Sequence, residues 1–272
     1  MKPAPFDYVR ARSVGQAAST LADAAGDGKI LAGGQSLLPV LALRMARPRV
    51  LVDINRIAGL ATVHPTDGMV RMGALVRHSQ LAEQREHPLL AEAARWIGHT
   101  AIRSRGTLGG SLAHADPAAE LPTVAAALDA TVHITGPSGS RTTTATEFLV
   151  GALETTLADD EVITAIDLPL PTRWGFAELS RRHGDFGLVT VVAAEVDGHR
   201  RIAIGGVGSV PLRPAEAEHL LNEDAPLARV AAAAGAVAAP SGDLHAPAAY
   251  RQAMTEEFTR RALAAMSTNS TA

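Results

Sequence analysis

The sequence predicts an α+β protein of two domains, and three observations carry this prediction. A strand, a glycine-rich turn, a short helix and a second strand follow one another over residues 29–54, as in an α/β unit. Glycine-containing turns separate later pairs of apolar segments, which is typical of antiparallel hairpins. A proline pair, Pro169 and Pro171, then marks the best candidate for a domain boundary.

The opening region predicts a helix, a strand, a short helix and another strand. Ser13 is a suitable N-cap for a helix over 14–25, because apolar residues follow it at helical spacing and glycines end it. A strand over 29–32 then enters the first Gly-Gly pair. The predicted segments that follow are a helix over 37–43 and a strand over 50–54.

The next region predicts antiparallel strands interrupted by helices. We expect a hairpin of 60–63 and 69–72 around the turn 64–68, and a second hairpin of 131–135 and 141–144. A helix near 89–97, a glycine-rich loop over 105–111, a helix over 121–128 and a strand over 162–168 complete the region.

Beyond the prolines, the sequence predicts an antiparallel hairpin covered by helices. Segments 189–196 and 201–204 flank Asp197-Gly198, a strong hairpin signal. Helical patterns follow over 215–221, 228–238 and 250–265. The polar end, 267–272, is expected to fray.

Composition excludes several classes of function. The 272 residues include no cysteine, which excludes disulfides, thiol nucleophiles and iron–sulfur ligands within this sequence. A net charge of −3 and an aromatic content of 3% give no reason to expect a nucleic-acid partner. The opening residues 1–7 lack the apolar core of a signal peptide, so we expect a cytoplasmic protein without membrane insertion.

Two glycine segments are the main candidates for a binding site. Leu31–Leu38 places Gly33-Gly34 and Ser36 before a helix, and Gly106–Ser111 places Gly109-Gly110 between two hydroxyl side chains. Glycine lets backbone N–H groups approach an anion closely, so both segments can surround a pyrophosphate. Tight turns explain each Gly-Gly pair equally well, and both interpretations stay open at this point.

Other chemistries find little support. The phosphate-binding G-x-x-x-x-G-K-[ST] pattern is missing, and Gly206-Val207-Gly208 fits a strand end better than a dinucleotide fingerprint. The ten histidines show no metal-binding spacing. We expect His114 and Asp116 to lie in a loop ordered by Asx-type hydrogen bonds.

Two further types of side chain have an open role. Arg103 and Arg105 alternate along a segment expected to be extended, where they either balance a pyrophosphate or lie at the surface. Trp96 and Trp174 either stack on a ligand ring or pack in the core.

Three motifs in order resemble one known family. They are LAGGQSLL at 31–38, IRSRGTLGGSLAHADPAAELP at 102–122 and IAIGGV at 202–207. With PFDY at 5–8 and SRRHGDF at 180–186, they resemble the FAD-binding medium subunit of molybdenum hydroxylases, the family of carbon monoxide dehydrogenase and xanthine dehydrogenase. The matches span nearly the whole chain.

The resemblance implies a fold and a set of FAD contacts. The expected fold is a vanillyl-alcohol-oxidase-like (PCMH-type) FAD-binding domain over 1–171, with lobes of about 1–56 and 57–171, followed by a C-terminal flavoprotein domain over 174–272. By position, the residues implied to bind FAD non-covalently are Leu31, Ala32, Gly33, Gly34, Gln35, Ser36, Leu37, Leu38, Thr107, Gly109, Gly110, Ser111, Glu120 and Ile163. Glu120 stands where relatives usually have Asp, and Ala177 where some have Lys.

The resemblance also implies an activity, without a catalytic or metal-binding side chain in this chain. The FAD is expected to receive electrons from a small 2Fe-2S subunit and pass them to an external acceptor, while a large molybdenum-cofactor subunit hydroxylates the substrate. A dimer of heterotrimers is the expected assembly. The alternatives are a stand-alone FAD-dependent oxidoreductase of the same fold, similar to the enolpyruvyl reductase of cell-wall synthesis, or a non-catalytic assembly subunit. The substrate and the acceptor (oxygen, quinone, NAD or a protein) stay open.

Overall fold

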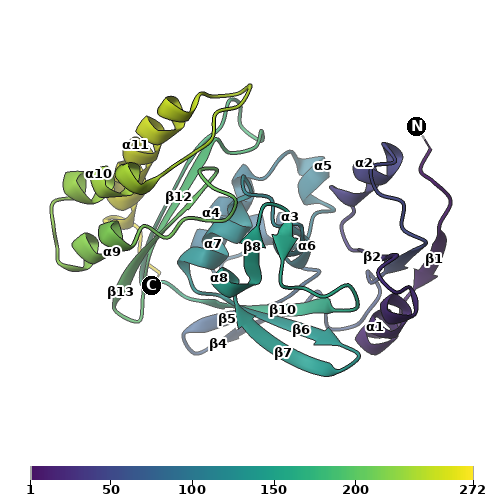
Figure 1. Ribbon diagram of the computed structural model, residues 1–272. Helices are drawn as coiled ribbons and strands as arrows, with labels where there is room; N and C mark the ends of the chain where they lie inside the picture. The colour runs from purple at the N-terminus through teal and green to yellow at the C-terminus, as the bar shows by residue number, and fades with distance from the viewer. Residues whose placement is uncertain (1, 272) are drawn as a thin grey trace.

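The computed structural model describes residues 2–271, and Figure 1 shows three bodies along the chain. The first contains strands β1 (Asp7–Arg10), β2 (Gly28–Leu31) and β3 (Val50–Asp53), which form a parallel sheet in the order β1-β3-β2. Helices α1 (Val14–Asp23) and α2 (Leu37–Ala42) connect the strands. Ser13 caps α1, since its Oγ accepts the Gln16 N–H at 3.1 Å, as predicted.

The second body is built on a five-stranded antiparallel sheet of order β4-β5-β10-β6-β7. Its strands are β4 (Val63–Thr66), β5 (Met69–Gly73), β6 (Thr131–Gly136), β7 (Gly139–Thr144) and β10 (Val162–Pro169). The helices are α3 (His78–Ala82), α4 (Pro88–Trp96), α5 (Thr100–Arg103), α6 (Leu108–His114), α7 (Glu120–Ala127) and α8 (Ala145–Phe148). A small hairpin, β8 (Leu149–Gly151) and β9 (Glu154–Thr155), follows α8.

The third body is a three-stranded antiparallel sheet with helices on one face (Figure 1). Its strands are β11 (Arg173–Leu179), β12 (Val189–Val196) and β13 (His199–Gly205). Helices α9 (Ala215–Asn222), α10 (Leu227–Val237) and α11 (Ala248–Met266) follow. The predicted α+β class, with two lobes followed by an antiparallel sheet covered by helices, agrees with these three bodies.

Strand β12 explains how the second and third bodies are joined. Side chains alternate between the two faces of a strand. Val192, Ala194 and Val196 therefore enter the core of the second body, together with α4 and α7. Val189, Val191 and Ala193 enter the other core, beneath α10 and α11. The strand is buried on both faces, which is why its sequence is almost continuously apolar.

The hairpin predicted around 64–68 begins later than its pattern indicates. Its first strand covers 63–66, and only Asp67-Gly68 forms the turn. Pro65 was expected in a turn, but β4 is an edge strand, where a residue without an N–H does not break the ladder. Strands β1, β8, β9 and β11 and helices α3, α5 and α8 were not predicted.

The expectation that the polar end frays is wrong for its described part. The Thr271 N–H donates to Thr172 O at 3.1 Å, and Arg173 Nη2 donates to Ser267 O at 3.0 Å. Residues 267–271 are therefore held against the start of β11. Met1 and Ala272, the outer limits of the two predicted domains, lie outside the described residues. Within 2–271, every helix is too short or too polar to cross a lipid bilayer.

Candidate FAD site between two glycine segments

The first glycine segment, Leu31–Leu38, connects the end of β2 to α2. Gly34 has φ +73°, a left-handed conformation that favours glycine. Gly33 is buried, and a Cβ there would stand 2.4 Å from the carbonyl oxygen of Arg105. Within residues 2–271, the backbone N–H groups of 33–36 donate to no protein acceptor. The segment therefore offers free donors at a position where only glycine fits.

The second glycine segment differs from the loop that was expected. Helix α6 begins inside it at Leu108, with Thr107 as its N-cap. The Gly110 N–H donates to Thr107 Oγ1 at 3.2 Å, and the Gly109 N–H donates to Ala74 O at 2.9 Å. Both glycine donors are thus occupied by the protein. Thr107 Oγ1 keeps its own proton free, and the Ser111 hydroxyl forms no hydrogen bond with residues 2–271.

The two segments, which come from different lobes, lie in direct contact. Gly33 packs on the Arg105 carbonyl and on Gly106, and a Cβ added at Gly110 would lie 4.0 Å from the Cβ of Ala32. A loop from the parallel sheet and a helix N-terminus from the second body are brought together. This contact between residues 72 and 73 positions apart in the sequence is the geometry expected of a shared ligand site.

Glu120 and Glu178 form a second polar feature, which sequence reasoning found only in part. Glu120 opens α7 and Glu178 lies on β11, and their side chains are 7% and 5% exposed. Burial, with a smaller effect of Asp116, raises the pKa of Glu120 to about 7. Burial and the charge of Glu120 raise the pKa of Glu178 to about 9.

One oxygen of Glu178 lacks a partner. Oε2 accepts the Thr190 hydroxyl at 3.2 Å, whereas Oε1 is buried and has no hydrogen bond within the described chain. Such a buried unsatisfied group is rare in native proteins and calls for a ligand or a proton. Glu178 stands next to Ala177 in the strand that the sequence pattern missed, so only the fold brings it near Glu120.

Ile163, Asp116 and Trp174, which the sequence analysis also considered, have structural roles. Ile163, on β10, is 5% exposed and belongs to the same core as Leu108 of α6. Asp116 Oδ1 accepts the Ala118 N–H at 2.9 Å, which confirms the Asx-type turn for Asp116, whereas His114, expected in the same loop, is the last residue of α6. Trp174 packs against the main core.

The structure answers the open questions about Arg103 and Trp96. The segment with Arg103 is helical rather than extended, because Arg103 caps the preceding turn by donating to Ile97 O and Gly98 O at 3.0 and 2.8 Å. Trp96 stands 5.3 Å, centroid to centroid, from the His183 ring and donates to Glu92 Oε1 at 3.2 Å.

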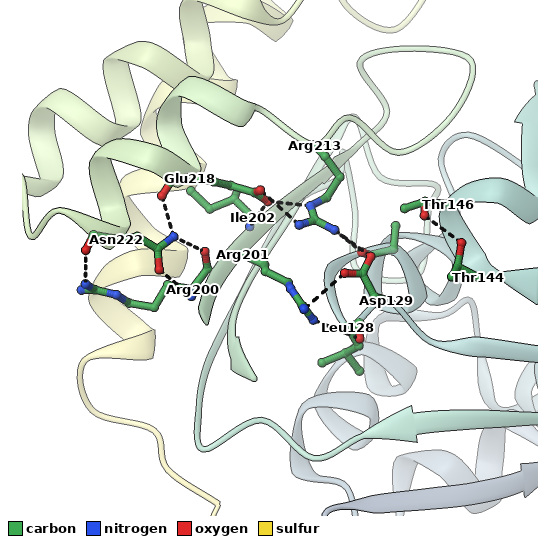
Figure 2. A network of polar contacts seen from close by, with 11 residues as sticks. Leu128, Asp129, Thr144, Thr146, Arg200, Arg201, Ile202, Arg213, Glu218 and Asn222 are labelled. Atoms are coloured by element: carbon green, nitrogen blue, oxygen red, sulfur yellow. Dashed lines mark hydrogen bonds and ion pairs between the residues drawn. The ribbon is translucent and has the colours of Figure 1, made fainter. Parts of the chain in front are cut away.

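A polar network fixes the third body to the second (Figure 2). Arg213 donates to Ala126 O at 2.9 Å and Asp129 Oδ1 at 3.0 Å, and holds Glu218 through two further contacts. Arg201 Nη2 lies 3.4 Å from the other Asp129 oxygen. The Gly206 N–H also donates to Pro117 O at 2.8 Å, at the strand end predicted for 206–208. Contacts near both ends of α7 thus hold the two bodies in one orientation.

These features fit FAD and offer no alternative metal centre. A diphosphate needs N–H and hydroxyl donors, which residues 33–36, Thr107 and Ser111 present. The sugar hydroxyls of a dinucleotide need acceptors, and the unpartnered oxygen of Glu178 is one. In the described part of the chain, no three His, Asp or Glu side chains gather as a metal-binding group would.

Comparison with known families and proteins agrees with this geometry. Residues 4–171 match the model of the FAD binding domain in molybdopterin dehydrogenase, and residues 174–266 match that of the CO dehydrogenase flavoprotein C-terminal domain. The 6-hydroxypseudooxynicotine dehydrogenase complex subunit alpha of Paenarthrobacter nicotinovorans is 44% identical, over 97% of this chain and 95% of its own. The carbon monoxide dehydrogenase medium chain of Hydrogenophaga pseudoflava is 37% identical, over 97% of both chains.

Solved structures give the same result. A chain of carbon monoxide dehydrogenase from Hydrogenophaga pseudoflava superimposes with a TM-score of 0.91 at 37% identity, covering 98% of both chains. A chain of quinoline 2-oxidoreductase from Pseudomonas putida 86 gives a TM-score of 0.92 at 35% identity, covering 98% of this chain and 99% of its own. The resemblance stated from the motifs is confirmed. The chain belongs to the family of FAD-binding medium subunits of molybdenum hydroxylases and is an oxidoreductase subunit.

Proposed function

We propose that this chain carries FAD as the electron-transfer subunit of a molybdenum-dependent hydroxylase. In the proposed complex, electrons arrive from a small 2Fe-2S subunit and leave to an external acceptor. A large subunit with the molybdenum cofactor hydroxylates the substrate. Bound FAD supplies the chemistry of accepting and releasing these electrons. The chain has no cysteine, so any cluster that delivers electrons must be held by a partner.

The residues of this chain hold and orient the cofactor. We assign the diphosphate to the free N–H groups of 33–36 and the hydroxyls of Thr107 and Ser111. Glu120 and Glu178 would accept from or donate to the sugar hydroxyls, and Ile163 would support the ring system from β10. The single observation that supports the site most is the contact of Gly33 with Arg105 and Gly106, since it unites donors from two lobes.

Purification of the complex from its native host tests the proposal. We expect the chain to copurify with two partners, with flavin absorbance near ~450 nm and with molybdenum and iron in fixed ratio to protein. Light scattering of this complex tests the dimer of heterotrimers. A colourless chain that takes up no added FAD would contradict the proposal.

Two alternatives make different predictions for the same preparation. A stand-alone flavoenzyme would show turnover without molybdenum or iron. An assembly subunit would keep the complex intact after Gly34→Trp or Gly110→Trp, with unchanged FAD content, because its glycines would be only turns. We expect both variants to lose FAD.

The domain limits and the location are part of the proposal. We assign 1–171 to FAD binding, with lobes meeting near 56, and 174–272 to the C-terminal domain; the break would fall in the short connection before β11. We also infer a cytoplasmic location, which cell fractionation of the host would test. Activity in the periplasmic fraction would contradict it.

A further inference from the structure

A side-chain bridge lies behind the two glycine segments. Asn55 follows β3, and its Nδ2 donates to Ala32 O at 2.8 Å and Leu31 O at 3.2 Å. The C=O and N–H of one trans peptide point in opposite directions. Because Asn55 holds the Ala32 carbonyl on its own side, the Gly33 N–H must point away from Asn55. Asn55 thereby directs the Gly33 N–H donor toward the side of the segment opposite Asn55.

Arg77 extends the bridge to the second segment. Its Nη2 donates to Asn55 Oδ1 at 2.6 Å, and its Nη1 donates to the carbonyl oxygen of Arg105. That carbonyl is the atom on which Gly33 packs. A single half-buried guanidinium therefore joins the asparagine of one lobe to the backbone of the other, and it does so at the point where the segments touch.

The bridge also places positive charge near the proposed diphosphate. Among residues 2–271, neither Arg77 nor Arg103 nor Arg105 forms an ion pair with a carboxylate. Loss of water around Arg77 and the charge of Arg105 lower the pKa of its guanidinium, and the more distant carboxylate of Asp53 raises it. Neighbouring like charges that are only partly balanced favour the binding of an anion.

We propose that Asn55 and Arg77 are positioning residues that set the spacing of the two glycine segments and give the site its preference for a diphosphate. Neither residue is assigned a contact with FAD: they act through the backbone of residues 31–33 and 105. The inference rests on the proposed function, since it concerns the same FAD site. It adds a residue pair that the glycine motifs do not contain.

The test compares ADP, which carries a diphosphate, with AMP, which does not. Each nucleotide competes with FAD for the full chain, and the ratio of their inhibition constants reports the diphosphate preference. We expect Arg77→Met to weaken FAD binding roughly 10- to 100-fold, as for loss of a charge-assisted hydrogen bond, and to bring the ADP-to-AMP ratio close to one. Arg56→Met is the matched control, because Arg56 is exposed and adjacent to Asn55.

Two more variants separate spacing from charge. Arg77→Lys keeps the charge but loses the planar double contact, so we expect partial retention of the ADP preference with weaker FAD binding. Asn55→Ala keeps the charge of Arg77 and releases the first segment, so FAD affinity should fall while part of the ADP preference is kept. These variants also serve if Arg77→Met does not fold.

The outcomes are distinct. An Arg77→Met or Arg77→Lys chain with the wild-type ADP-to-AMP ratio would overturn the inference. An equal loss in Arg56→Met would do the same, because it would show a general charge effect. A wild-type chain that binds no FAD would instead remove the proposed function.

Discussion

Replacing Gly33 by alanine is the most direct probe of how the two lobes meet. The new Cβ would lie 2.4 Å from Arg105 O and 2.9 Å from Gly106 Cα, both backbone atoms that cannot rotate away. The segments must separate by roughly 0.6–1 Å to restore ordinary contact, and overpacking of this kind costs about 1–3 kcal/mol. Because bound FAD would require the closed arrangement, its affinity should fall roughly 5- to 150-fold.

The assay is fluorescence titration of the FAD-free full chain with FAD. Gly15→Ala is the matched control, since Gly15 is an exposed position in α1 with no atom within 4 Å of the added Cβ. That control should bind FAD normally and gain up to about 1 kcal/mol of stability from helix propensity. Wild-type FAD affinity in Gly33→Ala would refute the argument that the close approach of the segments builds the site.

Three further substitutions test burial and charge. Burial and a neighbouring carboxylate raise the pKa of Glu178 to about 9. The folded chain therefore binds this proton more tightly than the unfolded chain does. As a result, the free energy of unfolding falls as the pH rises from 4.5 to 9. Glu178→Gln should flatten that fall in melting curves at pH 5 and 8, whereas Glu216→Gln, at an exposed site, should not. Arg213→Met should lower the free energy of unfolding, measured in urea, by roughly 1–2 kcal/mol. The control Arg260→Met removes an exposed ion pair and should cost less than about 0.5 kcal/mol. Equal effects of the two substitutions would contradict the role of Arg213 in holding the two domains together. A hydrogen bond from Arg71 lowers the pKa of Asp167, so its stabilisation is present above the unfolded pKa of 3.8 and is lost as the pH falls through the lower folded pKa. Asp167→Asn should therefore cost about 0.5–1 kcal/mol of unfolding free energy at pH 7 and progressively less below pH 3.8, as measured by urea unfolding.

Local signals were sufficient for much of the fold. Ser13, the glycines after α1 and the Asp197-Gly198 turn act through neighbouring residues, so their patterns predict structure correctly. Pro65 misled because the meaning of a proline depends on whether its strand is an edge, which neighbouring strands decide. Strand β11 was not predicted because the strand with which it pairs, β12, lies ten residues or more away in the sequence.

The candidate site likewise combines features that the sequence predicts with features that only the fold creates. The Gly-Gly pairs are visible in the sequence because close backbone approach demands glycine. That Ala74 occupies the Gly109 donor cannot be predicted locally, since Ala74 lies on another segment, whereas the Thr107 cap of Gly110 depends on neighbouring residues alone. Asn55, Arg77 and Glu178 are ordinary polar residues until the fold places each against a backbone carbonyl or another carboxylate.

Burial of β12 on both faces has a consequence for how the protein can be divided. Cutting the chain after β10 would strip the apolar cover from α4 and α7 and leave two half-cores in water. The two domains should therefore melt in one calorimetric transition. Neither half should be recoverable as a well-behaved fragment, so a hybrid that joins this FAD-binding half to a relative's C-terminal half must also transplant the matching side chains along that strand.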